Sequence, residues 1–472
     1  MSLSGSGRIG IWLGDSFAEV AEISAQVSSP HRDTAERTPA SVILKTLRWF
    51  HPKKSVSETL REILTSRVAG GDTEGGEIRI ATSRAEMSVA RKQGTEPAVL
   101  VTAGFETWAK LGSKVLTTAP ALRSERAWFP STREKIFGVE ERVHADGSVA
   151  RELKSEELEF LIAKLELLKI KEIAIAFLHA DRFPGHEKIA AEFFRSRGYH
   201  VTTSHELPSA SRFSDVERAR RTVENAFADT VVRDDLESLR TVLRDLALEE
   251  KWQIRFQTTS GLKDESSASS VRGGVEFALA AAIPSDVELG YFFGLEEFLG
   301  FRKLADGSRE TYLLPVQPTA QIGVSSWPFP SWTSIDRGYE PGPMLFGRSH
   351  QLTLLDVLFV RDRFSREIDG FSERVQAKSS ARILEALSTL GKNLAEPGRR
   401  AVDAKDVAQD LETGLVERLS MDLSFSAGAS KSVYLAGPLA SVLMTLLAHR
   451  RSDLDFKIDA ELSVASAALG GN

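Results

Sequence analysis

The amino-acid sequence predicts an α/β protein, and three observations lead to this prediction. Short apolar runs of strand type alternate along the chain with amphipathic runs of helix type. The composition, 42% hydrophobic and 27% charged, is that of an ordinary globular protein. The length of 472 residues suggests two or three domains, and no repeat of fixed period interrupts the pattern.

The N-terminal part begins with a predicted β-hairpin. Residues Arg8 to Ile23 read as two strands joined by a tight turn at Gly14-Asp15-Ser16. The spacing of apolar residues then predicts a helix over Ser55 to Val68. Further alternation predicts a strand at Ile78 to Ala81, a helix at Ser83 to Lys92 and a strand at Ala98 to Thr102.

The middle of the chain continues the alternation. A clear apolar stripe predicts a helix over Ser155 to Lys169, and an apolar strand follows at Ile173 to Leu178. Pro184 is expected to begin a helix that runs to about Arg197, because proline is favoured in a first helical turn. The remaining predictions are a strand at Val201 to Thr203, one or two helices within Asp215 to Glu250, and a loop at Ser260 to Gly274.

The C-terminal part opens with a proline-rich stretch from Pro315 to Pro343, which predicts an extended connection. Its aromatic residues fit either a partner-binding surface or core packing under a long loop. Helices are expected again from about Asp362. Ser432 to His449 should combine a strand with a helix entered through Gly437-Pro438.

Charge and composition exclude several classes of function. The 60 basic and 66 acidic side chains are interspersed, so the sequence predicts no nucleic-acid binding. The absence of cysteine excludes disulfides, thiolate nucleophiles and cysteine-bound zinc. Neither a signal sequence nor an apolar run of about 18 residues is present, so we expect a cytoplasmic protein that does not span a membrane.

Five stretches follow one another in an order that resembles a known family. They are FGVEERVHADG at 137–147, AIAFLHADRFPGHE at 174–187, ERARRTVENA at 217–226, EPGPMLFGR at 340–348 and AGP at 436–438. Together they resemble the hydantoinase A and 5-oxoprolinase family, with its related ketone carboxylase subunits, over nearly the whole chain. The resemblance implies an actin-like ATPase architecture of two ribonuclease-H-like halves. It suggests a first domain at residues 1–196 and a second at 197–472 that includes the proline-rich excursion at 315–343.

The resemblance also implies an activity. Members of this family carry out ATP-dependent hydrolytic ring opening of a cyclic amide of the hydantoin or oxoproline type. ATP phosphorylates the amide oxygen, and water then attacks the activated carbon. The implied cofactors are ATP and Mg²⁺, and the implied partner is a second, hydantoinase B-like subunit or another copy of the chain.

The family binds the phosphates of ATP with two turns of the pattern D-x-G-G-T-x-T-D. The first falls at Trp12 to Glu19 and the second at Tyr291 to Leu299, YFFGLEEFL. A third turn of the family, GGAGP, lies near the C-terminus, and Gly437 keeps its last glycine. The resemblance therefore implies a nucleotide site at Gly14, Asp15, Ser16, Glu19, Gly294 and Gly437.

Both phosphate turns depart from the family pattern. Trp12 stands where the first aspartate is expected, which removes a charge that Mg²⁺ needs, and Asp15 replaces a glycine and repels phosphate. Two hypotheses follow. The chain is either an enzyme of this family or a non-catalytic homologue that lost nucleotide binding and acts as a binding or scaffolding subunit.

Other residues leave alternatives open. His179, Asp181 and His186 are of metal-ligand type, but they also fit an ordinary strand-to-helix turn with His186 and Glu187 facing solvent. Glu217 and Arg218 fit either a substrate pocket or a solvated helical pair. Glu296 and Glu297 are of acid–base type, yet neighbouring residues point to different faces, so no joint site is predicted.

Overall fold

The computed structural model divides into two compact units. Unit 1 comprises residues 1–91, 237–265 and 273–472, and unit 2 comprises residues 92–236 and 266–272. The boundary near residue 196 that the sequence suggests stays a prediction. The residues that the structure describes are 7–14, 17–25, 41–49, 55–68, 75–107, 128–207, 213–264, 268–304, 306–314, 344, 352–363, 373–394, 402–426 and 431–470.

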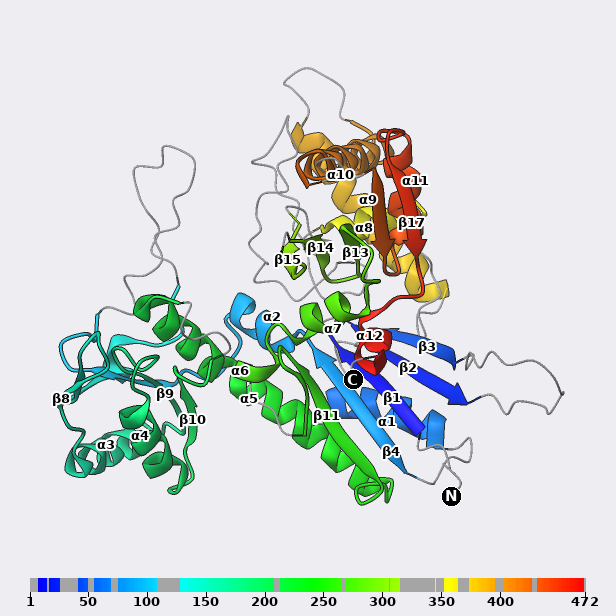
Figure 1. The fold of residues 1–472 in the computed structure, drawn as a ribbon. Helices are drawn as coiled ribbons and strands as arrows, with labels where there is room; N and C mark the ends of the chain where they lie inside the picture. Colours follow the sequence, from blue (N-terminus) through cyan, green and yellow to red (C-terminus); the bar gives the residue numbers. More distant parts are fainter. Residues whose placement is uncertain are drawn as a thin grey trace. The chain divides into compact units, whose positions relative to one another are not determined.

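Unit 1 contains a six-stranded mixed sheet in the order β12-β11-β4-β1-β2-β3 (Figure 1). The antiparallel strands β1, β2 and β3 form a meander, and β4 and β11 run parallel to β1 on its other side. The predicted first hairpin is therefore present. The strands are β1 Gly7–Leu13, β2 Phe17–Ala25, β3 Ser41–Trp49, β4 Gly76–Thr82, β11 Trp252–Thr258 and β12 Gly261–Lys263.

A second sheet of unit 1 repeats this arrangement. Its order is β15-β14-β13-β16-β17, again an antiparallel meander of three strands followed by two parallel strands. The two sheets repeat the same strand order, but the sequence contains no repeat of fixed period that would indicate it. The strands are β13 Leu289–Phe293, β14 Phe298–Lys303, β15 Arg309–Leu313, β16 Ser432–Ala436 and β17 Asp455–Asp459.

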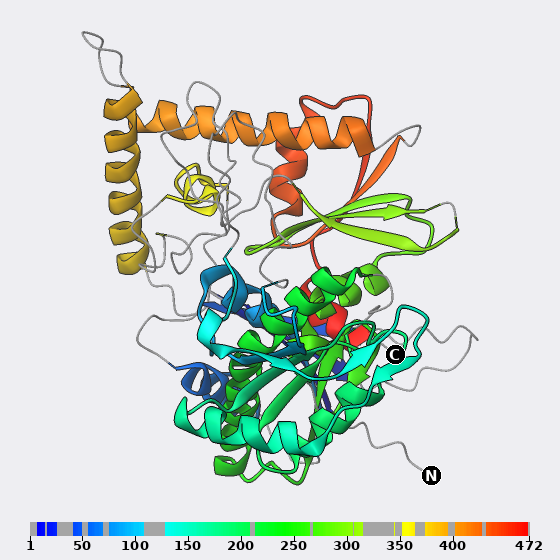
Figure 2. The ribbon, with the colours of Figure 1, turned by 90° about the vertical axis from the view of Figure 1, so that its left-hand side faces the viewer.

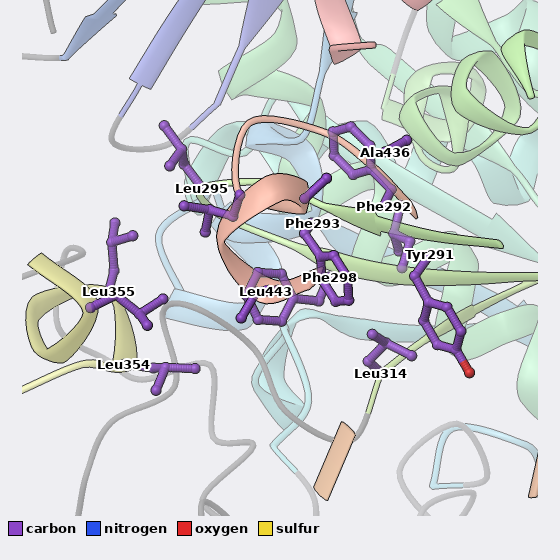
Figure 3. Close-up of a cluster of buried hydrophobic side chains, with 14 of the residues drawn as sticks. Tyr291, Phe292, Phe293, Leu295, Phe298, Leu314, Leu354, Leu355, Ala436 and Leu443 are labelled. Atoms are coloured by element: carbon purple, nitrogen blue, oxygen red, sulfur yellow. The ribbon is translucent and has the colours of Figure 1, made fainter. Parts of the chain in front are cut away.

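The core of unit 1 forms where β13 and β14 present aromatic side chains to the helices around them. Tyr291 stacks on Phe293 with ring centroids 6.0 Å apart, and Phe298 meets Phe293 edge to face at 5.2 Å. Figure 3 shows these rings together with Leu295, Leu314, Leu354, Leu355 and Leu443. Burial raises the pKa of Tyr291, and the neighbouring Tyr312 and Asp422 raise it further. The hydroxyl of Tyr291 donates a hydrogen bond to Asp422 at 2.8 Å. This phenol stays protonated at physiological pH.

Helices cover both sheets of unit 1. The helices α7 and α12 pack together against the first sheet, where α12 contacts β1, β2 and β4 (Figure 1). The long helices α9 and α10 pack on each other, and α10 also contacts α8 and α11 (Figure 2). The helices are α1 Val56–Val68, α2 Arg84–Arg91, α7 Gly274–Ala282, α8 Leu354–Val360, α9 Glu373–Leu394, α10 Ala404–Ser426, α11 Ala440–Ala448 and α12 Val464–Gly470.

Unit 2 is built on an all-parallel sheet in the order β10-β9-β5-β6. β6 follows β5 in the chain and lies on one side of it, whereas β9 and β10 lie on the other side. The direction in which strands are added therefore reverses between β5 and β9. The strands are β5 Ala98–Thr102, β6 Ile136–Val139, β9 Glu172–Ala176 and β10 His200–Thr203, with the small hairpin β7 Arg142–Val143 and β8 Val149–Arg151 beside them. The helices are α3 Ser155–Leu167, α4 Gly185–Arg195 and α6 Ala268–Val271, and α5 Asp215–Asp245 continues into unit 1.

Most of the predicted elements are present. The sequence did not predict β3, β15 or α12, and helices return with α8 at Leu354, earlier than the expected Asp362. The region Ser260 to Gly274 is not a continuous loop, because it contains β12 and α6. The proline-rich stretch 315–343 lies outside the described residues. Within the described part of the chain, no helix has the length and apolar character needed to cross a membrane.

Candidate functional site

Two hairpin turns of unit 1 close in the same way. The N–H of Gly14 donates to the carbonyl of Phe17 at 2.9 Å, and the N–H of Gly294 donates to the carbonyl of Glu297 at 3.0 Å. The first turn joins β1 to β2 and the second joins β13 to β14, which are equivalent strands of the two sheets. Asp15 lies, with Ser16, outside the described residues. The turn predicted at Tyr291 to Leu299 is thus the structural counterpart of the N-terminal turn.

The second turn contacts the first through the side chain of Glu296. Its Oε1 accepts a hydrogen bond from the N–H of Phe17 at 3.0 Å. A Cβ atom on Gly14 would lie 2.5 Å from Oε2 of Glu296, so the carboxylate of Glu296 lies directly against this glycine. Backbone N–H groups of such turns are the donors that bind phosphate oxygens in many proteins. Here a carboxylate of the same chain occupies one of them.

A small cavity of about 40 Å³ lies beside the two turns. A single water needs about 10–15 Å³ of such space, so this cavity has room for a few waters at most. Typical small-molecule pockets hold several hundred Å³. Its wall is mainly apolar but includes the carboxylates of Glu19, Glu296 and Glu297. Trp12, Gly294 and Pro438 also line it.

Trp12 fills the position where the resemblance implies a metal-associated aspartate. It lies on β1 opposite Glu19 of β2, and its side chain is 6% exposed. Its indole Nε1 has no hydrogen-bond partner. The apolar ring is held in the core cluster of unit 1, against which the helices α7 and α12 also pack. Packing therefore explains the tryptophan better than binding of a cation.

Gly437 supplies a third turn, between β16 and α11. Its φ of +99° is in the region that favours glycine, and a Cβ there would lie 2.7 Å from the carbonyl oxygen of Phe293. Nearby, burial and a hydrogen bond to Asp459 raise the pKa of Tyr434, whose hydroxyl donates at 2.8 Å. Pro438, next to Gly437, lines the cavity. The turn is thus in place beside the paired hairpins.

The residues at these turns do not fit MgATP. The cavity is far smaller than a nucleotide, and the carboxylate of Glu296 already holds the N–H of Phe17. Negative side chains from both turns would repel phosphates. Over the described ranges of the chain, no group of three or more His, Asp or Glu side chains is arranged to hold a metal ion. Gly14, Glu19, Gly294 and Gly437 lie near one another, but their role in nucleotide binding stays a prediction.

Arg218 of unit 2 is not a pocket residue open to solvent. Its side chain is 2% exposed, and its guanidinium donates to Ser204 Oγ at 3.0 Å, to the Phe177 carbonyl at 3.1 Å and to Asp181 at 3.2 Å. It also pairs with Asp215. The reading of Arg218 as part of a solvated surface pair is therefore wrong. Four of its five N–H donors have partners inside the unit, so Arg218 ties the start of α5 to the ends of β9 and β10.

Glu217, the neighbour of Arg218, lies at the surface and pairs with Arg221. Its side chain is 38% exposed and accepts a hydrogen bond from Arg221 at 2.8 Å. Such exposed pairs contribute little to stability. Glu217 and Arg218 therefore have different partners within unit 2, and their role in a substrate pocket stays a prediction.

His186 and Glu187 are buried rather than solvated. His186 is 2% exposed, with Nδ1 2.7 Å from Glu141 and Nε2 3.3 Å from Glu152. Glu187 is fully buried and accepts from the N–H of Phe177 at 2.9 Å and from other donors of the β10 end. The expectation that both face solvent is wrong. The strand-to-helix turn places them inward, where α4 covers the sheet.

The three weak metal candidates have different partners. His186 binds Glu141, Asp181 binds Arg218, and His179 lies beside Asp215. They therefore do not form one ligand set in the described structure, in agreement with the absence of a three-ligand group there.

Sequence reasoning missed the role of Glu296 in joining the two turns. The available signal was its position, because Glu296 is the third residue of its turn just as Ser16 is of the first. It also missed Asp215, whose only sequence signal is its place at the start of α5.

Comparison with known proteins gives the family context. Residues 34–198 match the family described as the hydantoinase/oxoprolinase N-terminal region. A 5-oxoprolinase of Saccharomyces cerevisiae is 35% identical over 105 residues, which is 22% of this chain and 8% of that protein. An uncharacterized protein of Methanocaldococcus jannaschii is 20% identical over 77% of this chain. The match spans 58% of the length of that archaeal relative.

Solved structures share the fold. The ATP-dependent caprolactamase from Pseudomonas jessenii superposes with a TM-score of 0.63 at 18% identity, covering 98% of this chain and 70% of that one. A nucleotide-free acetone carboxylase structure gives a TM-score of 0.65 at 13% identity, covering 98% and 69%. These similarities show that the chain shares the fold of these two structures, and the sheets and helices confirm the predicted α/β class. The actin-like ATPase architecture stays what the family resemblance implies.

Proposed function

We propose that this chain, whose residues 34–198 match the hydantoinase/oxoprolinase N-terminal region, is a homologue of these proteins that does not use ATP and acts as a binding or scaffolding subunit. The observation that carries the proposal is the hydrogen bond from the N–H of Phe17 to Glu296. A carboxylate on this donor competes with the phosphate that the turn would otherwise bind. The size of the cavity and Trp12 at its wall support the same conclusion.

The proposed partner is a second subunit of hydantoinase B type or another copy of this chain. Support comes from the family resemblance, in which the complete reaction needs a second subunit. A subunit of this kind contributes its fold and its surfaces, while the chemistry takes place elsewhere in the assembly.

We expect calorimetry to detect no saturable binding of MgATP or MgADP by the full chain with an affinity better than about 100 μM, near −5.5 kcal/mol. The physical reason is that binding must first displace the Glu296 carboxylate and then overcome repulsion from Glu19 and Glu297. Saturable binding in the low micromolar range would contradict the proposal.

A matched pair of variants identifies the competing charge. Glu296→Gln and Glu297→Gln each remove one carboxylate from the cavity wall, but only Glu296 is hydrogen-bonded to Phe17. We therefore expect inorganic phosphate to bind Glu296→Gln more tightly than it binds Glu297→Gln or the wild type. Equal affinities for the two variants would exclude Glu296 as the competing anion.

A second candidate function is ATP-dependent hydrolytic opening of a cyclic amide. The observation that favours it is the fold shared with the ATP-dependent caprolactamase over 98% of this chain. Under this alternative, MgATP binding would be accompanied by ATP-dependent loss of caprolactam or oxoproline. An assay with and without ATP decides between the two functions, and we expect no ATP-dependent turnover by this chain alone.

A further inference from the structure

The helix α3 of unit 2 carries apolar residues on two opposite faces (Figure 1). Leu158, Leu161 and Leu165 are buried in the core cluster that also contains residues of β5 and β9. On the other face, the side chain of Phe160 is 65% exposed and that of Leu167 is 83% exposed. A helix that covers a sheet needs only one apolar face. The second apolar face of α3 therefore requires another explanation.

The exposed face of α3 has the residue spacing of a helix–helix contact. Glu156, Phe160, Ala163 and Leu167 follow one another at alternating steps of four and three residues, which places them in one stripe along the helix. All four side chains are exposed. Phe160 and Leu167 occupy equivalent positions of a seven-residue repeat, and the small Ala163 between them permits close approach of a second helix. Single exposed apolar residues are common on protein surfaces, but this stripe has the pattern of a helix that packs on another helix.

The charges beside the stripe indicate which helix fits against it. Glu159 and Glu166 are exposed along one edge of the stripe, and Lys164 is exposed along the other. Neither glutamate side chain has an ion-pair partner among the described residues. Glu157 also lies on the edge of Lys164, but it is half-buried and accepts a hydrogen bond from the N–H of Glu140 at 2.7 Å. The acidic edge of one helix therefore complements the basic edge of an identical helix that lies beside it and runs parallel to it.

We propose that this face of α3 pairs with α3 of a second copy of the chain, with the two helices side by side and parallel about a two-fold axis. Phe160 and Leu167 of the two copies pack against each other in the centre of the contact. Glu159 of each copy meets Lys164 of the other copy, five residues further along, as in a parallel coiled coil. The ammonium of Lys164 lies 4.5 Å from the centre of the Phe160 ring, which holds it at the edge of the stripe. The inference deepens the binding role proposed above and rests on its form in which the partner is another copy of the chain.

The association of two copies is expected to be weak. The 13 residues of α3 make a helix about 20 Å long, so one face of it is smaller than a standard interface of about 800 Å² per partner. We expect a dissociation constant on the order of 10–100 μM, with monomer at about 1 μM and dimer at several hundred μM. Sedimentation equilibrium of the full chain over this range measures the constant. A chain that stays monomeric at about 500 μM would overturn the proposal.

Calorimetry with MgATP on the same samples separates this pairing from the proposed function. A chain that stays monomeric and binds no MgATP would overturn the pairing and leave the loss of nucleotide binding in place. A dimer that forms through α3 and binds MgATP would overturn the proposed function and leave the pairing in place.

Two matched variants locate the contact. Leu167 on α3 and Phe425 on α10 of unit 1 are both 83% exposed, so a charge at either position leaves the core of the protein intact. Leu167→Glu is expected to weaken dimer formation at least about tenfold, because it places a carboxylate in the apolar centre of the contact. Phe425→Glu should leave the dissociation constant unchanged. Equal dissociation constants for the two variants would exclude α3 as the contact surface.

A pair of charge-reversal variants tests the parallel direction of the pairing. Glu159→Lys and Lys164→Glu each place like charges opposite one another in the dimer, so each variant alone should dimerise at least about tenfold more weakly than the wild type. In an equimolar mixture, the two lysines of one variant face the two glutamates of the other. The mixed dimer should therefore form with about the affinity of the wild type. A mixture that associates no better than the separate variants would overturn the parallel pairing of α3.

Discussion

Arg218→Met is expected to lower the free energy of unfolding of unit 2 by about 3–5 kcal/mol, the range for breaking a buried ion pair from one side. The variant leaves Asp181 and Asp215 without their buried cation and removes the donors of Ser204 and the Phe177 carbonyl. Unpaired charge and lost hydrogen bonds act in the same direction. Urea titration followed by hydrogen exchange in peptides from β9 and β10 measures the effect within unit 2.

The control for this variant lies one turn along the same helix. Arg221 is 47% exposed and pairs with the exposed Glu217. Arg221→Met should cost no more than about 1 kcal/mol, as for other surface pairs. If the two variants shift the urea midpoint of unit 2 equally, the buried network around Arg218 does not hold the unit together.

Gly10→Ala is expected to destabilise unit 1 by about 3 kcal/mol, at the upper end of the cost of overpacking. The added Cβ would lie 2.3 Å from the carbonyl oxygen of Ala465 and 2.8 Å from Cγ of Leu469, so α12 must move away from β1. The helix cannot yield cheaply, because Ala465 and Ala468 are fully buried. Denaturant titration by circular dichroism measures the loss, and hydrogen exchange over residues 464–470 locates it.

Gly290→Ala is the matched change in the other sheet. A Cβ there would meet the carbonyl oxygen of Tyr434 at 3.4 Å, an ordinary contact. We expect less than about 1 kcal/mol for this substitution in a strand. A Gly10→Ala protein as stable as Gly290→Ala would show that α12 is not seated on β1 as described.

The sequence carries enough information to predict most of the elements. The hairpin at Arg8 to Ile23 and the helix at Ser155 to Lys169 were predictable because each buries one face, which fixes the period of its apolar residues. β12 and α6 were not predicted because they are three and four residues long, too short to show a period. The longer β3 and α8 were also missed. The repeated order of the two sheets is invisible in sequence, since it depends on which strands pair.

The candidate sites were predictable only in part. The glycines of the turns could be located from the family pattern, and at Gly437 a positive φ and the nearby carbonyl oxygen of Phe293 explain why glycine is there. The burial of Arg218 and His186 could not, because a charged residue in a charged stretch looks solvated until its partners are known. Those partners are far away in sequence. Glu296, for example, is 279 residues from Phe17.

The N–H of Phe17 gives the most direct measurement of the central claim, that Glu296 occupies the donor a phosphate would need. In ¹⁵N-phenylalanine-labelled protein, the Phe17 amide resonance should stay in place as MgATP is added to the wild type. It should shift in Glu296→Gln but not in Glu297→Gln, because only the first change alters its acceptor. A saturable shift of the Phe17 resonance when MgATP is added to the wild type would contradict the claim and identify the paired turns as a working nucleotide site.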